Sequence, residues 1–187
     1  MRYGMVIDLN DCVRCRSCYV NCKAANQIPT QFDVPGKPAR MWFDEHPKGK
    51  YPAVAMVFIP YHCMQCDAAP CVGVCPTGAN HKNSSGVVTI DAKKCIGCKA
   101  CVKACPYGAS YFREDRKVAD KCDFCSARVA KGLAPSCADK CTGGAILFGD
   151  LDDPRSEVSI KIASAGAKPL KAKMAATKPK VYYVSGV

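Results

Sequence analysis

Four cysteines fall within eleven residues in the segment from Cys95 to Cys105, and a proline follows the last of them. A tetrahedral zinc site usually draws its sulfurs from two Cys-x-x-Cys pairs that a longer loop separates, and this segment has no such loop. Its spacing, Cys-x2-Cys-x2-Cys-x3-Cys-Pro, is typical of iron–sulfur sites in which three thiolates bind one [4Fe-4S] cluster and the fourth binds another. The segment therefore predicts a second cluster nearby.

The cysteine count of the whole chain agrees with that prediction. Sixteen of the 187 residues are cysteine, and they form four groups of four. The groups are Cys12, Cys15, Cys18 and Cys22; Cys63, Cys66, Cys71 and Cys75; Cys95, Cys98, Cys101 and Cys105; and Cys122, Cys125, Cys137 and Cys141. Because no cysteine is left over, the count predicts four [4Fe-4S] clusters, each bound to iron through four thiolates. Folding is expected to depend on cluster insertion.

Two other uses of so many cysteines are alternatives. Disulfide scaffolds belong to small secreted chains with a signal peptide, and residues 1–8 contain no apolar segment of that kind. Closely spaced Cys-x-x-Cys repeats are also poor disulfide geometry. A zinc-binding structural module is the alternative of another class; it would be colourless, whereas iron–sulfur clusters are brown and absorb at about 400 nm.

The formal net charge of +11 does not indicate nucleic-acid binding. That count treats cysteine as neutral, whereas each thiolate-bound cluster carries roughly two negative charges, which offset much of the excess. The remaining positive charge is interpreted as a solvated basic surface rather than as a surface that binds an acidic partner. A solvated helix face is likewise favoured for four lysines near the predicted ligands, namely Lys94, Lys99, Lys103 and Lys121. We therefore expect no nucleic-acid partner.

The sequence shows no catalytic constellation, so the chain is not expected to be an enzyme by itself. His46, His62 and His81 are scattered and have no activated nucleophile close in sequence. For His62, which precedes Cys63, a packed or solvated ring is favoured over a hydrogen bond to a cluster sulfur. The nearest approach to a membrane span is the apolar stretch at residues 53–59, far short of about 18 residues, so no direct span is predicted.

Short strands and helices must position the ligands. Residues 5–8 precede the first group as residues 88–91 precede the third, a repeat that predicts a strand leading into a cysteine-bearing helix. Proline or glycine after the fourth cysteine of the later groups ends the helix, and strands are predicted to follow at 110–112 and 146–148. The backbone N–H groups of these turns are predicted to donate to cluster sulfurs.

The order of the groups predicts an α+β fold of two nested ferredoxin-like units, each of the bacterial type with two [4Fe-4S] clusters. Groups two and three are close in sequence and form the inner unit, residues 63–105. Group four must then pair with group one across this segment, so residues 1–22 plus 106–150 form the outer unit. One ferredoxin-like unit is thus inserted into the other.

An inserted segment, residues 23–62, joins the first group to the second. It is predicted to contain a β-hairpin with strands at 39–44 and 53–60 and a turn at 46–50. A further helix is predicted at residues 126–131, within the loop of group four.

Residues 151–187 carry no cysteine and are predicted to form an extended tail that docks on a partner subunit. A helix at 154–165 and a strand at 181–184 are predicted within it. Its lysines are expected to face acidic groups or solvent; they are Lys168, Lys171, Lys173, Lys178 and Lys180.

These motifs resemble one family, the four-cluster iron–sulfur subunits of dimethyl sulfoxide reductase-type molybdenum enzymes, and most of all those of polysulfide and thiosulfate reductases. The resemblance covers roughly residues 3–154, and the four-group pattern with its four-residue gap between Cys66 and Cys71 is highly specific. Residues 148–154 and 180–184 look like the family's exit segment and tail. Thr142 departs from the pattern, because a proline often follows the last cysteine there.

The resemblance implies a crossed set of ligands. The first cluster would be held by Cys12, Cys15, Cys18 and Cys141, and the second by Cys22, Cys122, Cys125 and Cys137. The third would be held by Cys63, Cys66, Cys71 and Cys105, and the fourth by Cys75, Cys95, Cys98 and Cys101. The first cluster would lie nearest the catalytic subunit and the fourth nearest the membrane.

The resemblance also implies partners and a function. The chain would carry electrons between a membrane anchor subunit that reacts with quinone or quinol and a molybdopterin-containing catalytic subunit of an anaerobic respiratory reductase, with polysulfide, thiosulfate or a related substrate. The iron–sulfur subunit of a formate dehydrogenase, hydrogenase or nitrite reductase complex is the alternative. The complex would be membrane-associated, on the periplasmic face through co-export with a partner or on the cytoplasmic face.

Overall fold

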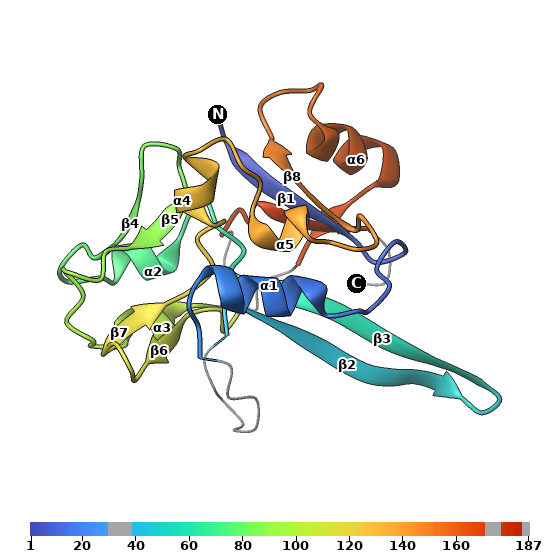
Figure 1. Cartoon of the computed structure of the whole chain (residues 1–187), viewed down its shortest axis with the longest axis horizontal. Helices are drawn as coiled ribbons and strands as arrows, with labels where there is room; N and C mark the ends of the chain where they lie inside the picture. The colour runs from blue at the N-terminus through green and yellow to red at the C-terminus, as the bar shows by residue number, and fades with distance from the viewer. Residues whose placement is uncertain (30–38, 171–176, 185–187) are drawn as a thin grey trace.

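The computed structural model describes residues 1–29, 39–170 and 177–184. Within them the chain forms a four-stranded sheet, three two-stranded hairpins and several short helices, as Figure 1 shows. No helix in this part of the chain is long and apolar enough to span a membrane. The predicted α+β class is confirmed.

The four-stranded sheet joins both ends of the chain and has the strand order β8-β1-β10-β9. Its strands are β1 (Tyr3–Asp8), β8 (Ile146–Asp150), β9 (Lys168–Pro169) and β10 (Val181–Val184). β1 pairs in antiparallel register with β8 and in parallel register with β10. Met5, Val6 and Ile7 are fully buried, which is typical of a central strand covered on both faces.

The predicted hairpin of the inserted segment is present, with a different turn. β2 (Met41–Lys50) pairs with β3 (Ala53–His62) along ten residues, and the hairpin projects from the body (Figure 1). The turn predicted at 46–50 is wrong, because those residues continue the strand and the chain reverses at residues 51 and 52. Pro47 is tolerated there since each strand of a two-stranded hairpin keeps one edge free of ladder hydrogen bonds.

Two smaller hairpins and five short helices hold the cysteines. The hairpins are β4 (Asn80–Lys82) with β5 (Val88–Ile90), and β6 (Tyr111–Arg113) with β7 (Val118–Asp120). The helices are α1 (Ser17–Ala25), α2 (Pro70–Gly73), α3 (Ala100–Ala104), α4 (Ser126–Val129) and α5 (Ser136–Asp139). Helices this short are not stable alone, so packing and ligand binding must stabilise them. α1 packs against α5, and α2 packs against α3.

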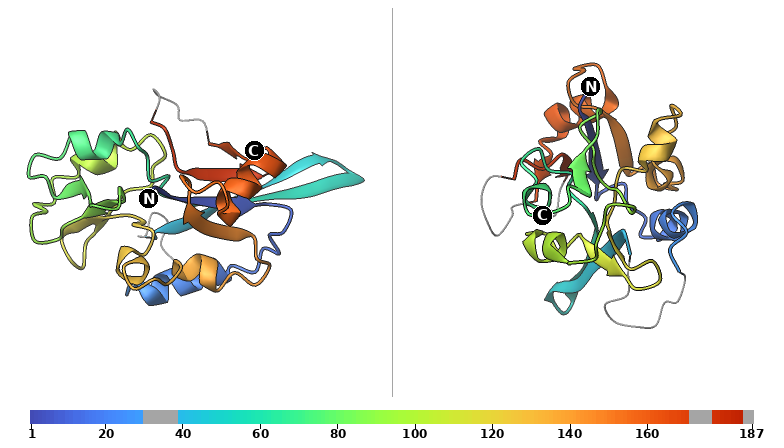
Figure 2. Two further views of the ribbon diagram at one scale, coloured as in Figure 1. Left: turned by 90° about the horizontal axis from the view of Figure 1, so that it is seen from above. Right: turned by 90° about the vertical axis from the view of Figure 1, so that its left-hand side faces the viewer.

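The elements between residues 63 and 120 lie together at one end of the molecule, away from the central sheet (Figure 2). This group includes the β6–β7 hairpin, although the predicted boundary after residue 105 assigned it to the outer unit. The reason is a contact with the third cysteine group, in which Ala119 N–H of β7 donates to Cys95 Sγ at 3.5 Å.

The extended C-terminal tail is a wrong prediction for the described residues 151–170 and 177–184. The predicted helix is α6 (Glu157–Ala165), whose first turn is capped by the Ser156 hydroxyl, and Val158 packs it against the central sheet. The predicted strand, β10, lies inside that sheet. Lys180 is buried, with Nζ 2.8 Å from the carbonyl oxygen of Gly86 and 3.7 Å from Asp67 Oδ1, so the predicted acidic group is present for this lysine and comes from the chain itself. Lys171 and Lys173 lie outside the described residues.

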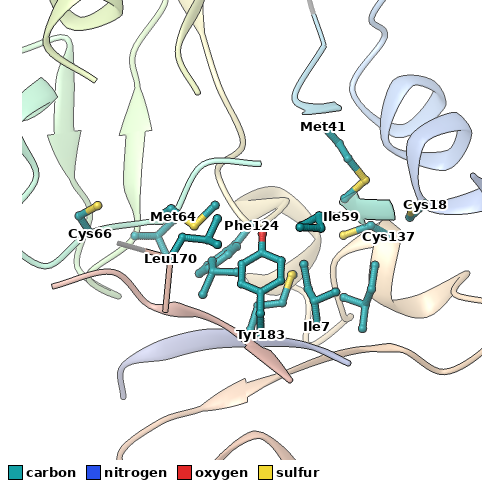
Figure 3. Close-up of a cluster of buried hydrophobic side chains, with 14 residues drawn as sticks. Ile7, Cys18, Met41, Ile59, Met64, Cys66, Phe124, Cys137, Leu170 and Tyr183 are labelled. Atoms are coloured by element: carbon teal, nitrogen blue, oxygen red, sulfur yellow. The ribbon is translucent and has the colours of Figure 1, made fainter. Parts of the chain in front are cut away.

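The main apolar core is small and lies between the cysteine groups. Figure 3 shows Phe124, Met64 and Tyr183 in its middle, with Cys66 on one side and Cys137 on the other. Phe124 meets the ring of Phe148 edge to face, and the Tyr183 hydroxyl donates to Pro60 O at 2.9 Å. The core therefore fixes the distance between the two ends of the molecule.

Candidate iron–sulfur centres

The first Cys-x-x-Cys turn of each cysteine group contains a left-handed residue. The residue before the second cysteine has a positive φ in all four turns: Arg14 (58°), Gln65 (47°), Gly97 (71°) and Phe124 (54°). This backbone costs a non-glycine residue about 1–2 kcal/mol, so its recurrence indicates a compensating interaction. Backbone N–H groups in such turns form a concave nest that binds anions, as at many iron–sulfur sites. The chain thus has four turns suited to an anionic group.

A hollow of about 340 Å³, counting space open to solvent, lies beside α2. Four thiols line it, those of Cys63, Cys66, Cys71 and Cys105. Cys105 belongs to the third group in sequence, but α3 packs beside α2 and Cys105 leaves α3 in an extended conformation. The structure therefore brings together the same four cysteines that the resemblance assigns to the third cluster.

Cys75 makes the reciprocal crossing. It lines a second hollow, of about 320 Å³, together with Cys95, Cys98 and Cys101. Asn80 N–H donates to Cys75 Sγ at 3.3 Å, and Cys98 is exposed at the mouth of the hollow. These are the four cysteines that the resemblance assigns to the fourth cluster.

A third hollow, of about 370 Å³, lies under the base of the β2–β3 hairpin. Its thiols are Cys12, Cys15, Cys18 and Cys141, and Phe58 and Pro60 of β3 form part of its wall. Thr142 Oγ1 lies 3.7 Å from Cys15 Sγ, so the residue that replaces the family's proline contacts a thiol of the first group. The grouping matches the one that the resemblance assigns to the first cluster.

The remaining cysteines meet where α1 packs against α5. Asn26 Nδ2 lies 3.7 Å from Cys22 Sγ and 4.0 Å from Cys125 Sγ, which joins the first and fourth groups. Burial raises the pKa of Cys137 well above its ordinary value, and the neighbouring thiolates of Cys22, Cys125 and Cys18 raise it further. Burial also raises the pKa of Cys122, and the neighbouring thiolates of Cys22, Cys137 and Cys63 raise it further.

The polar groups around the hollows suit a sulfide-bearing group. Ala109 N–H donates to Cys105 Sγ at 3.3 Å, as Asn80 N–H does to Cys75, so two of these turns direct an N–H group at a thiol sulfur, whereas donation to the sulfurs of a cluster stays a prediction. Within residues 1–29, 39–170 and 177–184, the Asn80 side-chain amide and the Ser110 hydroxyl are buried without a hydrogen-bond partner, and each lines a hollow. Such orphaned groups are costly unless an acceptor faces them, and cluster sulfides are acceptors.

The spacing of the thiols suits a cluster better than a single ion. Among the residues that the structure describes, no three His, Cys, Asp or Glu side chains are arranged to hold one metal ion. A zinc ion needs its sulfurs at about 2.3 Å, whereas three of the thiol sets each line an open hollow. The arrangement therefore favours [4Fe-4S] clusters over the zinc alternative.

Several of these thiols are strongly perturbed by burial. Burial raises the pKa of Cys18 and of Cys22 to about 12, and that of Cys66 and of Cys71 to about 11. Iron binds thiolates, and a coordinating metal centre deprotonates its thiols outright. These buried thiols therefore stay protonated at neutral pH until a metal centre displaces their protons.

Two buried polar residues tie the cysteine groups together, and the sequence identified neither Gln65 nor the burial of Lys121. Gln65 donates to Val88 O at 3.0 Å and to Cys122 O at 2.7 Å. Lys121 is also buried, and its ammonium contacts the carbonyl oxygens of Val88 and Cys122, so the predicted solvated face is wrong for this lysine. Neither residue carries a local sequence signal, because their partners are distant in the chain.

His62 is packed, as favoured from the sequence. Its Nδ1 lies 2.9 Å from Cys63 O and its ring meets Phe124 edge to face. Burial lowers the pKa of His62 to about 4, so the ring is neutral at physiological pH.

Comparison with known proteins places the chain in a family. Residues 11–79 and 54–151 each match a model described as a 4Fe-4S dicluster domain. The protein is 38% identical to the component designated B of polysulfide reductase from Wolinella succinogenes, over 98% of this chain and 94% of the relative. It is 37% identical to the component designated B of tetrathionate reductase from Salmonella typhimurium, over 98% and 72% of the two chains.

A third relative, the component designated B of sulfite dehydrogenase from Allochromatium vinosum, is 40% identical over 97% of this chain and 82% of its own length. Similarity over almost the whole chain, together with the crossed sets of thiols, excludes a chance resemblance of cysteine spacing. The protein belongs to the family of iron–sulfur electron-transfer subunits of dimethyl sulfoxide reductase-type oxidoreductase complexes.

Proposed function

We propose that the protein binds four [4Fe-4S] clusters and carries electrons between a membrane anchor subunit that reacts with quinone or quinol and a molybdopterin-containing catalytic subunit. The observation that carries the proposal is the crossing of Cys75 and Cys105 between two adjacent hollows. One cluster bound in each set of four thiols supplies a site that gains and loses one electron. The substrate chemistry belongs to the catalytic subunit, so the chain is not an enzyme by itself.

The proposed ligand sets follow the thiol groupings. They are Cys12, Cys15, Cys18 and Cys141 for the first; Cys22, Cys122, Cys125 and Cys137 for the second; Cys63, Cys66, Cys71 and Cys105 for the third; and Cys75, Cys95, Cys98 and Cys101 for the fourth. The first two sets form an outer ferredoxin-like unit around α1 and α5, and the last two form an inner unit around α2 and α3. Support for this nesting is the packing of each helix pair.

Neighbouring thiols give the order of the four sets. Cys18 of the first set is close enough to Cys137 of the second to raise the pKa of that thiol, and Cys63 of the third acts likewise on Cys122. Between the third and fourth sets, Cys71 of α2 and Cys101 of α3 belong to one buried cluster of side chains. The sets therefore follow one another in a line from first to fourth.

The two ends of this line reach the surface. Cys15 in the first set and Cys98 in the fourth are exposed, while Val13 and Ile96 beside them are 62% and 67% exposed. Exposed aliphatic side chains next to a terminal centre suit contact with another protein chain. We assign the first end to the catalytic subunit and the fourth to the membrane anchor, as in the resemblance.

Two of the relatives support a proposed substrate class. Polysulfide reductase and tetrathionate reductase act on chains of sulfur or on sulfur oxyanions, so we propose a respiratory reductase for a related sulfur compound. The complex is proposed to lie on the membrane, on the periplasmic face. The identity of the subunits that co-purify with the chain tests the substrate class, and a signal peptide on one of them would support the periplasmic face.

Analysis of iron and sulfide tests the cluster count. Anaerobically purified protein should contain roughly 16 iron atoms and 16 acid-labile sulfides, with the brown colour of [4Fe-4S] centres. About eight of each would leave two sets without clusters, and stoichiometric zinc in a colourless protein would contradict the function as a whole.

A further inference from the structure

Arg40, just before β2, connects three segments that are distant in sequence. Its Nη2 lies 2.8 Å from Asp120 Oδ1, and its Nη1 lies 2.7 Å from both Asp123 Oδ1 and Asn26 Oδ1. Asn26 ends α1, whereas Asp120 ends β7 and Asp123 follows Cys122. One guanidinium therefore holds the end of α1 against the fourth cysteine group.

This network is shielded from solvent. The side chains of Arg40, Asp120 and Asp123 are 15%, 12% and 22% exposed. Burial opposes the charged form of Arg40, but Asp123 and Asp120 outweigh it and raise the pKa of the guanidinium, so Arg40 stays charged. The effective dielectric constant is low at such a site, which strengthens hydrogen bonds and charge interactions.

The guanidinium decides which way the Asn26 amide points. Arginine has only donors, so the atom of Asn26 that faces Arg40 must be the amide oxygen. The NH2 group then faces the other way, where Nδ2 lies 2.8 Å from Cys22 O, 3.7 Å from Cys22 Sγ and 4.0 Å from Cys125 Sγ. The usual ambiguity between the oxygen and nitrogen of an asparagine is thereby removed.

We propose that Arg40 is a positioning residue for the second thiol set: it holds the Asn26 amide so that one N–H bond points to Cys22 O and the other to the sulfurs of Cys22 and Cys125, and this second donor raises the reduction potential of the cluster bound there. The inference rests on the proposed function, because it requires a cluster in that set. Asp120 and Asp123 hold the guanidinium of Arg40 in place by accepting its hydrogen bonds.

The sign of the effect follows from electrostatics. Reduction adds negative charge to the cluster and its thiolates, and an N–H donor stabilises that added charge. Hydrogen bonds to the sulfurs are among the factors that set the potentials of iron–sulfur clusters. Loss of the donor should therefore make the second cluster harder to reduce, without removing any ligand.

The test uses the full chain with its clusters assembled anaerobically, and a redox titration monitored by electron paramagnetic resonance. Asn26→Leu should lower one potential and leave the others unchanged. Asn26→Asp, which is nearly isosteric, should lower the same potential further, because a carboxylate adds charge and offers no donor. The shifted signal should be the one that Cys125→Ser alters.

Asn21→Leu is the matched control. Asn21 lies on the same helix, but its amide donates to Ser17 O at 2.9 Å. This variant should leave every potential unchanged. Native potentials in Asn26→Leu at native iron content, or a shift in another cluster, would overturn the inference.

A double-mutant cycle separates orientation from charge. Arg40→Met should lower the same potential, and the shift should be smaller in the Asn26→Leu background, because part of it acts through Asn26. Equal shifts in both backgrounds would mean that Arg40 acts by its charge alone and would overturn the positioning role. Should Arg40→Met not assemble, Arg40→Lys replaces it in the cycle, since one ammonium cannot hold Asn26 and both carboxylates at once.

The outcome also separates this inference from the proposed function. A native chain with zinc or without a cluster in the second set contradicts the function itself. A native chain with four clusters, in which Asn26→Leu shifts no potential, contradicts only the role of Arg40 and Asn26.

Discussion

Removal of residues 180–187 should abolish stable cluster binding, because β10 is part of the core. Val181, Tyr183 and Val184 are 0%, 3% and 6% exposed, and burying three such side chains stabilises the fold by about 5–9 kcal/mol. The whole free energy of unfolding of a domain is about 5–15 kcal/mol, so the loss takes most of it. The truncated chain should therefore retain little iron after anaerobic purification.

A graded pair of substitutions makes the same test within the full chain. Tyr183→Phe removes only the hydrogen bond to Pro60 O and should cost about 0.5–1.5 kcal/mol, whereas Tyr183→Ala also removes the buried ring and should cost about 3–5 kcal/mol. The midpoint of urea-induced loss of visible absorption should fall in that order. Tyr51→Phe, at a residue 93% exposed, is the control and should not move it.

The opposite result would restore the extended tail that the sequence suggested. If the truncated chain keeps its full iron content and its native urea midpoint, residues 180–187 contribute nothing to the core. Their buried contacts with β1 would then not exist in solution, and docking on a partner would be their only role.

Three further predictions concern single thiol sets. Gly97→Ala should destabilise the fourth set by about 1–2 kcal/mol, because φ is +71° and the new Cβ would lie 3.1 Å from Lys117 O; faster loss of that cluster's signal in air would show it. Cys105→Ser and Cys75→Ser should alter different signals in electron paramagnetic resonance, and loss of the same signal in both would contradict the crossed ligation. Ser110→Ala should lower the potential of the third cluster alone, because the buried hydroxyl has no hydrogen-bond partner in the described part of the chain; an unchanged potential would mean that it does not face the cluster.

Much of the local structure follows from short-range sequence patterns. The strand at residues 3–8, the helix at 157–165 and the strand at 181–184 were predicted to within a few residues, because alternation and capping act over one or two turns. The hairpin turn was misplaced because Pro47 and Gly49 are turn formers in general, whereas the observed register is set by ten cross-strand pairs.

Charged residues were the least predictable part of the site. Arg40, Lys121 and Lys180 look like surface cations in the sequence, but each is largely or fully buried against oxygen atoms from distant segments. Burial of a charge is tolerable only when partners surround it, and a single sequence does not show which residues will meet. The supporting network around the thiols was therefore not predicted.

The sixteen cysteines proposed as ligands were identified from the sequence, since thiolate chemistry and Cys-x-x-Cys spacing are local properties that can be recognised without knowledge of the fold. The place of β10 was decided only by the tertiary structure: residues 5–8 pair with residues 181–184, and no local pattern marks a parallel pairing across almost the whole chain. The same holds for Asn26, whose amide is a donor to Cys22 and Cys125 only because Arg40 arrives from another segment and holds its oxygen.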